Sequence, residues 1–242
     1  KKNRSNIIKV NNSIKFLNNF AKLKRQNCNA KIIAITGSAG KTSLKNMLKI
    51  ILQKYGYTHS SPRSFNNHFG VPISLSNLNQ NHLYGVFEVG MSKAGEINHL
   101  TKIIKPNLAV ITNIAEAHIE NFSNIKGIAK AKGEIIDNII KGGTVVLNRD
   151  DNFYNYLKIK AKIKKLNVVS FGRSKKSDIN LIHESKKGKS KKLTIKIKNK
   201  KLKIKIENAN IFNVLSSIAV LKALGLDYNK TTSLYRTFKP SE

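Results

Sequence analysis

IIAITGSAGKTSLKNML, residues 32–48, is the stretch that decides the fold. It opens with an apolar run, and Gly37 and Gly40 separate this run from a segment with helical spacing that begins at Lys41 and Thr42. The pattern predicts a buried strand, a glycine-rich turn and a helix. Glycines let the backbone N–H groups of such a turn point inward around an anion, and the positive end of the following helix adds to the attraction. The stretch therefore predicts a phosphate-binding site.

The residues after the second glycine indicate that the phosphate belongs to a nucleotide. Lys41 is placed to reach terminal phosphate oxygens, and the hydroxyl of Thr42 is placed to bind Mg²⁺. The general phosphate-binding loop has the spacing Gly-x-x-x-x-Gly-Lys-Ser/Thr, but the position five residues before Gly40 is Ile35. The spacing here is the shorter Gly-x-x-Gly-Lys-Thr. An ordinary glycine-rich turn of a doubly wound fold is the alternative.

Strand-like and helix-like segments alternate up to residue 172. The strands are predicted at 31–36, 84–90, 107–114, 143–148 and 167–172, and the helices at 41–55, 95–104, 125–140 and 152–165. The strands are apolar throughout, which is typical of a parallel sheet that helices cover on both faces.

The pattern changes to strict alternation of apolar and polar residues after residue 172. Strands at 178–184, 192–198 and 201–207 are predicted, with a loop over the lysine-rich stretch 185–192, a turn at 199–200 and a final helix over 210–226 that ends at Gly225. We therefore expect an α/β fold: a mostly parallel P-loop-type sheet flanked by helices, with a small antiparallel β appendage.

The charge of the chain is strongly positive. Lys and Arg number 45 against 13 Asp and Glu, which gives a formal net charge of +32 over 242 residues. Such a charge ordinarily suggests a nucleic-acid partner. The excess is mostly lysine, is spread along the chain, and accompanies no RNA- or DNA-binding motif with interleaved aromatic residues. We therefore expect no nucleic-acid partner and interpret the charge as a solvated surface that also attracts anionic ligands.

The location of the protein follows from what the sequence lacks. No apolar run approaches the roughly 20 residues that span a bilayer, so we expect no membrane insertion. The first residues are basic but have no apolar stretch of a signal peptide. The single cysteine, Cys28, excludes an internal disulfide framework and fits a reducing compartment. We expect a cytoplasmic protein.

Five segments resemble the Mur ligases, in the order and spacing of that family, which shares the shorter glycine turn. They are TGSAGKTS (36–43), SFNNHFGVPISLSNL (64–78), FEVGMSKAGEI (87–97), AVITNIAEAHIENFSNIKGIAKAKGEI (109–135) and NIFNVLSSIAV (210–220). The match covers roughly residues 12–240. It implies the fold predicted above and an ATP-dependent amide ligase, in which ATP converts a substrate carboxylate to an acyl phosphate that an amine then attacks.

Within the family, the segments are most similar to the members that add D-Ala-D-Ala to UDP-N-acetylmuramoyl-tripeptide, a peptidoglycan precursor. These two compounds are the substrates that the resemblance implies. A ligase of the same superfamily for another muropeptide residue or for folyl-polyglutamate is one alternative. A nucleotide- or nucleic-acid-binding module without ligase activity is another.

The resemblance also implies roles for individual residues. It assigns ATP binding to the turn and to three asparagines: Gly37, Ser38, Ala39, Gly40, Lys41, Thr42, Ser43, Asn113, Asn210 and Asn213. It assigns Mg²⁺ binding to Thr42, Glu88 and His118, and substrate binding to Asn66 and Asn67. It assigns catalysis to Lys41, His118 and Lys132, and Lys132 is the lysine that CO₂ carbamylates in many family members. Carbamylation needs a neutral amine, and hence a lowered pKa.

Each of these residues has an ordinary structural alternative. A carboxylate at a strand end, such as Glu88, caps a neighbouring helix in many proteins, and a lone histidine such as His118 is more often structural or exposed. Lys132 reads equally as a solvated helix lysine. Asn210 is a candidate N-cap, and Ala209 stands before it where the family has a histidine or an aromatic ring. Asparagines in a glycine-proline loop also form turns.

The resemblance implies a domain division as well. An amphipathic helix is predicted over 7–25, and we expect residues 1–28 to form a linker helix and residues 29–240 a Mur ligase central ATP-binding domain. The resemblance implies that full-length relatives have further N- and C-terminal domains, and we expect this chain to lack them. We expect a monomer that alone binds Mg-ATP weakly and ligates slowly or not at all, because we expect no closing domain.

Overall fold

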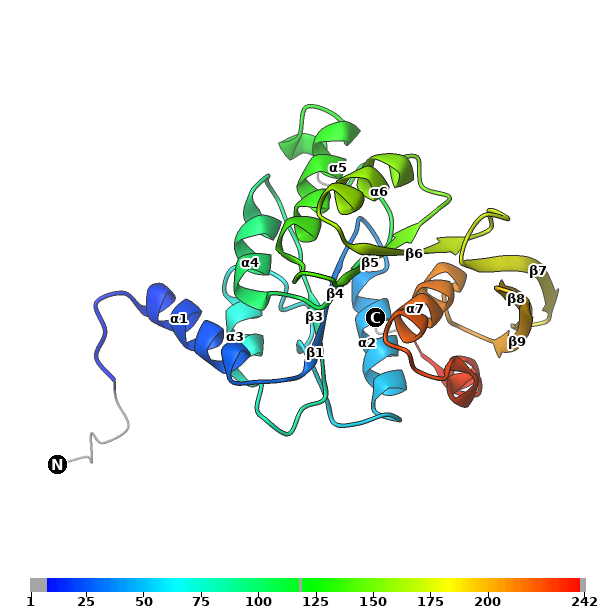
Figure 1. The fold of residues 1–242 in the computed structure, drawn as a ribbon, viewed down its shortest axis with the longest axis horizontal. Helices are drawn as coiled ribbons and strands as arrows, with labels where there is room; N and C mark the ends of the chain where they lie inside the picture. Colours follow the sequence, from blue (N-terminus) through cyan, green and yellow to red (C-terminus); the bar gives the residue numbers. More distant parts are fainter. Residues whose placement is uncertain (1–7, 118, 240–242) are drawn as a thin grey trace.

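A single sheet forms the centre of the computed structural model, which describes residues 8–117 and 119–239 (Figure 1). The described residues form nine strands in the order β2-β3-β1-β4-β5-β6-β7-β8-β9. Their bounds are β1 Lys31–Thr36, β2 Thr58–Ser60, β3 Tyr84–Glu88, β4 Leu108–Ile111, β5 Thr144–Asn148, β6 Asn167–Gly172, β7 Ile179–Lys187, β8 Ser190–Ile197 and β9 Lys200–Ile206. Strands β1 to β6 are parallel, and β7 to β9 run antiparallel to one another.

Helices cover both faces of the sheet. The α-helices are α1 Ser13–Gln26, α2 Lys41–Leu52, α3 Gly70–Ser76, α4 Glu96–Ile104, α5 Ile125–Gly133, α6 Tyr154–Ile163, α7 Ile211–Ala223 and α8 Leu234–Thr237. Short 3₁₀ turns lie at Ile119–Asn121, Glu134–Asn138 and Tyr228–Thr231. Figure 1 shows α2 and α7 on one side of the sheet, and α4, α5 and α6 on the other.

The central strands are apolar because both of their faces are buried. In β1, Ile32 and Ala34 pack in the core beneath α1, α3, α4, α5 and α6, whereas Ile33 and Ile35 pack in the core beneath α2 and α7. All four side chains are fully buried. Successive residues of a strand point to opposite faces. The apolar residues 32–35 therefore contribute side chains to both cores. The predicted parallel sheet is confirmed.

The antiparallel part continues the same sheet. β7 pairs with β6 in parallel, through Phe171 with Ile179 and Gly172 with Asn180, before it turns back into β8. The prediction of a loop over 185–192 is wrong, because β7 runs to Lys187 and β8 begins at Ser190. Exposed lysines occupy the ladder there, and Gly188, with a φ of +58°, makes the tight turn.

Two short elements between α2 and β3, the strand β2 and the helix α3, were not predicted. β2 has three residues, Thr58–Ser60, and lies at the edge of the sheet beside β3. α3 has seven residues and contains Pro72 in its first turn, where the missing N–H of proline costs no helical hydrogen bond. Both elements are too short and too polar at their ends to give a periodic signal.

The first helix docks on the domain through one arginine. The guanidinium of Arg25, near the end of α1, donates to the carbonyl oxygens of Cys28, Ile104 and Lys105 and to Oδ1 of Asn107. Asn107 Oδ1 also accepts from the backbone N–H of Ile32 in β1. Among the described residues, no helix is both long and apolar enough to cross a lipid bilayer.

Candidate functional site

The candidate site lies where β1, β3 and β4 end. Their carboxyl ends lie side by side, because β1 pairs with β3 through Ile35 and Glu88 and with β4 through Thr36 and Ile111. The connection after β1 passes over one face of the sheet through α2, and the connection after β3 passes over the other face through α4. Open α/β sheets bind ligands at such a reversal.

Two glycines let other strands and helices approach the turn between β1 and α2. Gly37 has a φ of +148° and Gly40 a φ of +82°, which side chains of L-residues rarely adopt. A Cβ at Gly37 would lie 1.9 Å from Oγ1 of Thr112, and one at Gly40 would lie 2.9 Å from Oδ1 of Asn213. Backbone conformation therefore favours glycine at both positions, and at Gly37 the side chain and backbone of Thr112 also leave no space for a Cβ.

The turn is held by side chains from distant parts of the chain. Asn113 accepts from the Ser38 N–H through its backbone oxygen, at 3.0 Å, and from the Ala39 N–H through Oδ1, at 2.9 Å. Thr112 donates its hydroxyl to the Ala39 oxygen at 2.6 Å, and Asn213 donates its amide to the Gly40 oxygen at 3.3 Å. The predicted asparagines 113 and 213 thus lie at the turn and order its backbone.

Helix α2 begins at Lys41, as predicted, and its first-turn N–H groups have no partner within the helix. Two ammonium groups lie beside them. Lys41 Nζ donates to the Gly37 oxygen at 2.8 Å, and Lys132 Nζ, from α5, donates to the same oxygen at 3.2 Å. The positive end of the helix and two lysines therefore converge on one small region.

Burial lowers the pKa of both lysines. Lys132 is 3% exposed, and its pKa falls to about 8, first because burial disfavours the charged form and then because Lys41 repels a second charge. Burial also lowers the pKa of Lys41, although the nearby Glu88 acts in the opposite sense. Lys132 is thus a buried amine, and the interpretation as a solvated helix lysine is wrong.

Glu88 is a buried carboxylate at the end of β3, with an exposure of 1%. Its Oε2 accepts from the hydroxyl of Thr42 at 2.8 Å, and its Oε1 accepts from the side-chain amide of Asn66 at 2.8 Å. The ammonium of Lys45, from α2, lies 3.9 Å from Oε2. The Thr42 and Glu88 side chains, which lie 46 residues apart in the sequence, therefore meet beside the turn.

The side chains at this point fit a magnesium ion. The Thr42 hydroxyl and the Glu88 carboxylate are hard oxygen donors, which Mg²⁺ prefers. The described residues contain no group of three or more His, Cys, Asp and Glu side chains that could hold a metal. This arrangement suits Mg²⁺, because in phosphate sites this ion takes only one or two protein ligands and completes its shell with phosphate and water. His118 lies outside the described residues.

A cleft of about 790 Å³ opens beside the turn. Its lining includes both site lysines, the segment after β3 and the loop before α3, namely Lys41, Lys132, 90–96 and 66–68. Asn66 binds Glu88 there, whereas Asn67 Oδ1 accepts from the N–H groups of Phe69 and Gly70 and so shapes the loop. The cleft is large enough for part of a small-molecule substrate.

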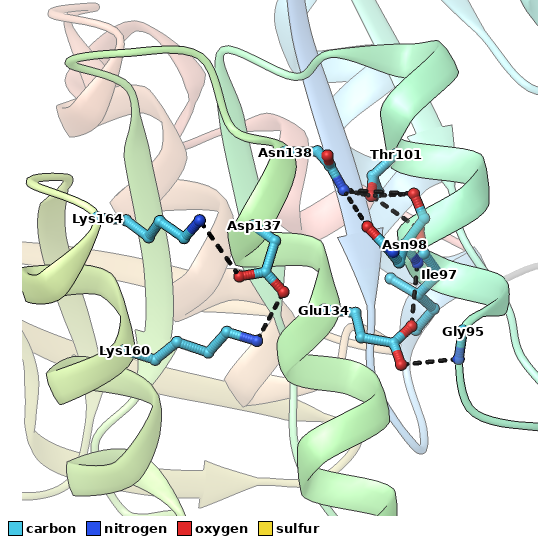
Figure 2. A network of polar contacts seen from close by, with 9 residues as sticks. All are labelled: Gly95, Ile97, Asn98, Thr101, Glu134, Asp137, Asn138, Lys160 and Lys164. Carbon is cyan, nitrogen blue, oxygen red and sulfur yellow. Dashed lines mark hydrogen bonds and ion pairs between the residues drawn. The ribbon is translucent and has the colours of Figure 1, made fainter.

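One wall of the cleft is held by a carboxylate, as Figure 2 shows. Glu134 lies two residues after Lys132, and its two oxygens accept from the N–H groups of Gly95 at 2.7 Å and Asn98 at 3.0 Å. Both N–H groups belong to the start of α4. Glu134 therefore joins the lysine-bearing segment to the cleft wall, and its charge suits the positive end of a helix.

Asn210 has the structural role that was the alternative to nucleotide binding. It is the N-cap of α7, and its Oδ1 accepts from the N–H of Asn213. By fixing the start of α7 it orients Asn213 toward Gly40. The other predicted residues of the turn, with Glu88, Asn66 and Lys132, come together as described.

Sequence reasoning missed three residues of the site: Lys45, Thr112 and Glu134. Lys45 had a signal, because it lies between Leu44 and Leu48 on the apolar side of a helix, where a lysine is unusual. Thr112 follows β4, and nothing in the sequence links it to Gly37. Glu134 faces away from the core in a helical pattern, and only the tertiary fold brings it to the start of α4.

Comparisons with known proteins identify the family of the chain. Residues 35–221 match the model of the Mur ligase middle domain. The chain is 45% identical over 177 residues to the UDP-N-acetylmuramoyl-tripeptide–D-alanyl-D-alanine ligase of Rickettsia prowazekii. The aligned segment covers 73% of this chain and 39% of that protein. The chain therefore spans about two fifths of the length of this relative.

Solved structures show the same fold. The crystal structure of MurF from Acinetobacter baumannii superposes with a TM-score of 0.90 and 29% identity, over 96% of this chain and 51% of that one. MurF ligase from Thermotoga maritima, solved in complex with ADP, has a TM-score of 0.82 and 27% identity, over 94% of this chain and 53% of that one. The glycine turn, the strand order and the family match lead to one conclusion: this chain belongs to the Mur ligase family, and residues 35–221 match its middle domain.

Proposed function

We propose that this chain carries the ATP-binding centre of a ligase that adds D-Ala-D-Ala to UDP-N-acetylmuramoyl-tripeptide. The observation that carries the proposal is the contact between Thr42 and Glu88, 2.8 Å apart beside a glycine turn and the start of α2. The 45% identity to a ligase of that name supports the choice of substrates.

The turn and the two lysines would hold the nucleotide. The first-turn N–H groups of α2 would bind phosphate oxygens, and Lys41 would exchange its bond to the Gly37 oxygen for a bond to phosphate. Thr42 and Glu88 would hold Mg²⁺, together with His118 by resemblance to the family. When bound, the ion neutralises charge on the transferred phosphoryl group.

The reaction has two steps. A carboxylate oxygen of the muropeptide attacks the γ-phosphorus of ATP, ADP leaves, and an acyl phosphate results. The amine of D-Ala-D-Ala then attacks the acyl carbon, an amide bond forms, and phosphate leaves. Negative charge develops in both steps, so the chain's contribution is Lys41, the helix N–H groups and the orientation of the reactants in the cleft.

Lys132 is suited to carbamylation. Its pKa of about 8 leaves part of the amine neutral near physiological pH. A neutral amine attacks CO₂, forms an N–C bond and releases a proton, which gives a side chain with one negative charge. Such a group beside Lys41 would orient Lys41 and the metal site. A carbamate signal in ¹³C NMR with labelled bicarbonate, absent in Lys132→Ala, would support this.

The organisation around this centre is also a proposal. We expect residues 1–28 to act as a linker and residues 29–240 as the middle domain, in a cytoplasmic monomer. The docking of α1 through Arg25 supports a fixed junction between the two parts. Light scattering of the purified protein measures the oligomeric state.

The decisive experiment measures phosphate release by the intact natural protein. We expect release from ATP only when UDP-N-acetylmuramoyl-tripeptide and D-Ala-D-Ala are both present, and its loss in Thr42→Val and Glu88→Gln. The exposed Lys49, one turn beyond Lys45 on α2, provides the control variant Lys49→Met, which should retain activity. Release with another amino acid, or with a folate and glutamate, would favour a sister ligase. Nucleic-acid binding with a steep salt dependence and no phosphate release would favour the binding module.

A further inference from the structure

Lys45 is a buried lysine that the proposed chemistry does not use. It lies on α2 between Thr42 and Lys49, and its side chain is 1% exposed. An ammonium group taken out of water is costly unless it is paired and hydrogen-bonded. A buried lysine is therefore expected to have a charge partner and hydrogen-bond acceptors close by.

The partners of Lys45 come from two different parts of the site. Its ammonium lies 3.9 Å from Oε2 of Glu88, whose side chain is 2% exposed. It also donates a hydrogen bond to the backbone oxygen of Arg63. Arg63 has a φ of +42°, a left-handed conformation that is uncommon for residues other than glycine. This conformation belongs to the loop from Ser61 to Asn67, which precedes α3.

That loop also touches Glu88 directly. The hydroxyl of Ser61 accepts from the Glu88 N–H at 3.2 Å, and Asn66 donates to Oε1 of Glu88. The Asn66 oxygen accepts from the N–H of Gly90, and Asn66 and Gly90 both line the cleft. Glu88, the loop and the cleft wall thus form one connected group. Lys45 contacts Glu88 and the loop residue Arg63.

We propose that Lys45 is a positioning residue that ties the carboxylate Glu88 to the cleft loop 61–67 through a single buried ammonium group. One side of the group balances the charge of Glu88 beside Thr42. The other side holds the Arg63 carbonyl and with it the strained turn of the loop. The catalytic consequence of this inference rests on the proposed function. The tether itself, the contact of the Lys45 ammonium with Glu88 and with the Arg63 oxygen, does not depend on that function.

The tether is tested by hydrogen exchange. In Lys45→Met, which keeps the apolar stem and removes the ammonium, we expect the amides of residues 63–67 and Gly90 to exchange about tenfold faster relative to the amides of β5. Lys49 is exposed and lies one turn along the same helix, so Lys49→Met should leave the exchange rates of these amides unchanged. A merely structural role would accelerate exchange across the whole domain, because global unfolding would govern it. A uniform change, or none in 63–67, overturns the proposal.

A second variant pair keeps the test decisive if Lys45→Met does not fold. The double variant Lys45→Met/Glu88→Gln removes both charges of the buried pair, which is better tolerated than the removal of one. Compared with Glu88→Gln alone, and with exchange taken relative to the amides of β5 to correct for the unpaired ammonium of the single variant, it reports on the bond to Arg63. We expect faster exchange of 63–67 in the double variant, and equal rates would contradict the tether.

The catalytic consequence is read as a split between kcat and KM. In the intact ligase, Lys45→Met should lower kcat about tenfold or more while the KM for D-Ala-D-Ala changes about twofold or less, because Lys45 is not among the residues that line the cleft. Lys45→Arg, which keeps the charge, should recover part of the loss. Undiminished kcat in Lys45→Met refutes the proposal. If the natural protein itself does not ligate, the proposed function fails, and hydrogen exchange alone then decides on the tether.

Discussion

Gly40 combines a left-handed backbone with a close neighbour, the side-chain oxygen of Asn213, which would have to shift to admit a Cβ, and this combination can be tested at the scale of one residue. In Gly40→Ala, the φ of +82° costs roughly 1–2 kcal/mol of stability. The added Cβ must also displace Asn213 from its bond to the turn. We expect the affinity for ADP, measured by calorimetry, to fall at least about tenfold.

Gly142 provides the matched control for that substitution. It has a similar φ of +73°, but a Cβ there meets nothing within 4 Å. Gly142→Ala should therefore lose a similar amount of stability without any loss of ADP affinity. Equal loss of affinity in both variants would show that backbone strain, and not the contact with Asn213, controls the turn.

His59 predicts a loss of stability in acid. Burial lowers its pKa to about 4, and the neighbouring His82 and Lys49 act in the same direction. Its ring bonds the Ser74 hydroxyl and contacts the Phe87 ring. The pKa of His59 is lower in the folded than in the unfolded protein. Its contribution to the free energy of unfolding is therefore fully present above about pH 6.5 and is lost as the pH falls toward 4, by an amount on the order of 3 kcal/mol.

Urea unfolding at several pH values between about 4 and 7 measures this dependence. In His59→Gln, which cannot take up a proton, we expect a flatter curve over this range, although the variant is less stable at neutral pH. Parallel curves for the two proteins would assign the acid sensitivity to other groups.

At the scale of elements, the network in Figure 2 distinguishes a helix cap from surface ion pairs. Glu134→Ala removes both acceptors from the start of α4, and we expect a loss of about 2 kcal/mol in the free energy of unfolding. Asp137→Ala, three residues along the same segment, removes the pairs with Lys160 and Lys164. Ion pairs that are open to solvent in part, as these are, contribute about 1 kcal/mol or less.

Chemical denaturation of the two variants gives the comparison. A larger loss for Asp137→Ala than for Glu134→Ala would mean that the contact between the lysine-bearing segment and α6 stabilises the site more than the cap does. The cleft wall is also expected to loosen only in Glu134→Ala, which hydrogen exchange of the amides of Gly95 and Asn98 measures.

The elements that could be predicted are those with a long apolar signal. Strands β1, β3, β4, β5 and β6 and helices α2, α4, α6 and α7 were predicted because their apolar residues repeat over two or more turns or fill a whole strand. The strand β2, with the sequence THS, carries no such signal, and its pairing with β3 defines it. The lysines at 186 and 187 suggested a loop, but a hairpin ladder accepts them because their side chains reach solvent.

The site was predictable where chemistry and local sequence coincide. The glycine turn, Lys41 and Thr42 are adjacent in the chain, and Glu88 follows a strand that the fold places next to β1. Lys45 was missed although its place on the apolar side of a helix was a signal, and its two partners, a carboxylate and a loop carbonyl, come together only in the tertiary structure. Asn113 as a nucleotide ligand stays a prediction, and in the structure its Oδ1 accepts from the Ala39 N–H of the turn itself.

At the scale of the whole molecule, the net charge of +32 predicts sensitivity to salt. Few carboxylates are present to offset the lysines, so the folded state carries self-repulsion that ions screen. We expect the Tm to rise by several degrees as NaCl increases from about 10 mM to about 300 mM. A Tm that does not change with NaCl would mean that the charges are spaced too widely to interact.

Sulfate at matched ionic strength separates screening from binding at the turn. A rise beyond that in NaCl, which disappears in Gly40→Ala, would indicate an anion on the turn. A rise of the same size in both proteins would indicate screening over the whole surface.

The Gly40 oxygen and the amide of Asn213 that donates to it are 173 positions apart, so the turn near the start of the domain is completed by its last long helix. During synthesis, a ribosome must therefore translate β7, β8, β9 and the start of α7 before this contact can form. A nascent chain that stops short of α7 would present a loose, incompletely ordered loop. We therefore expect the turn to reach its full order only after α7 has been translated.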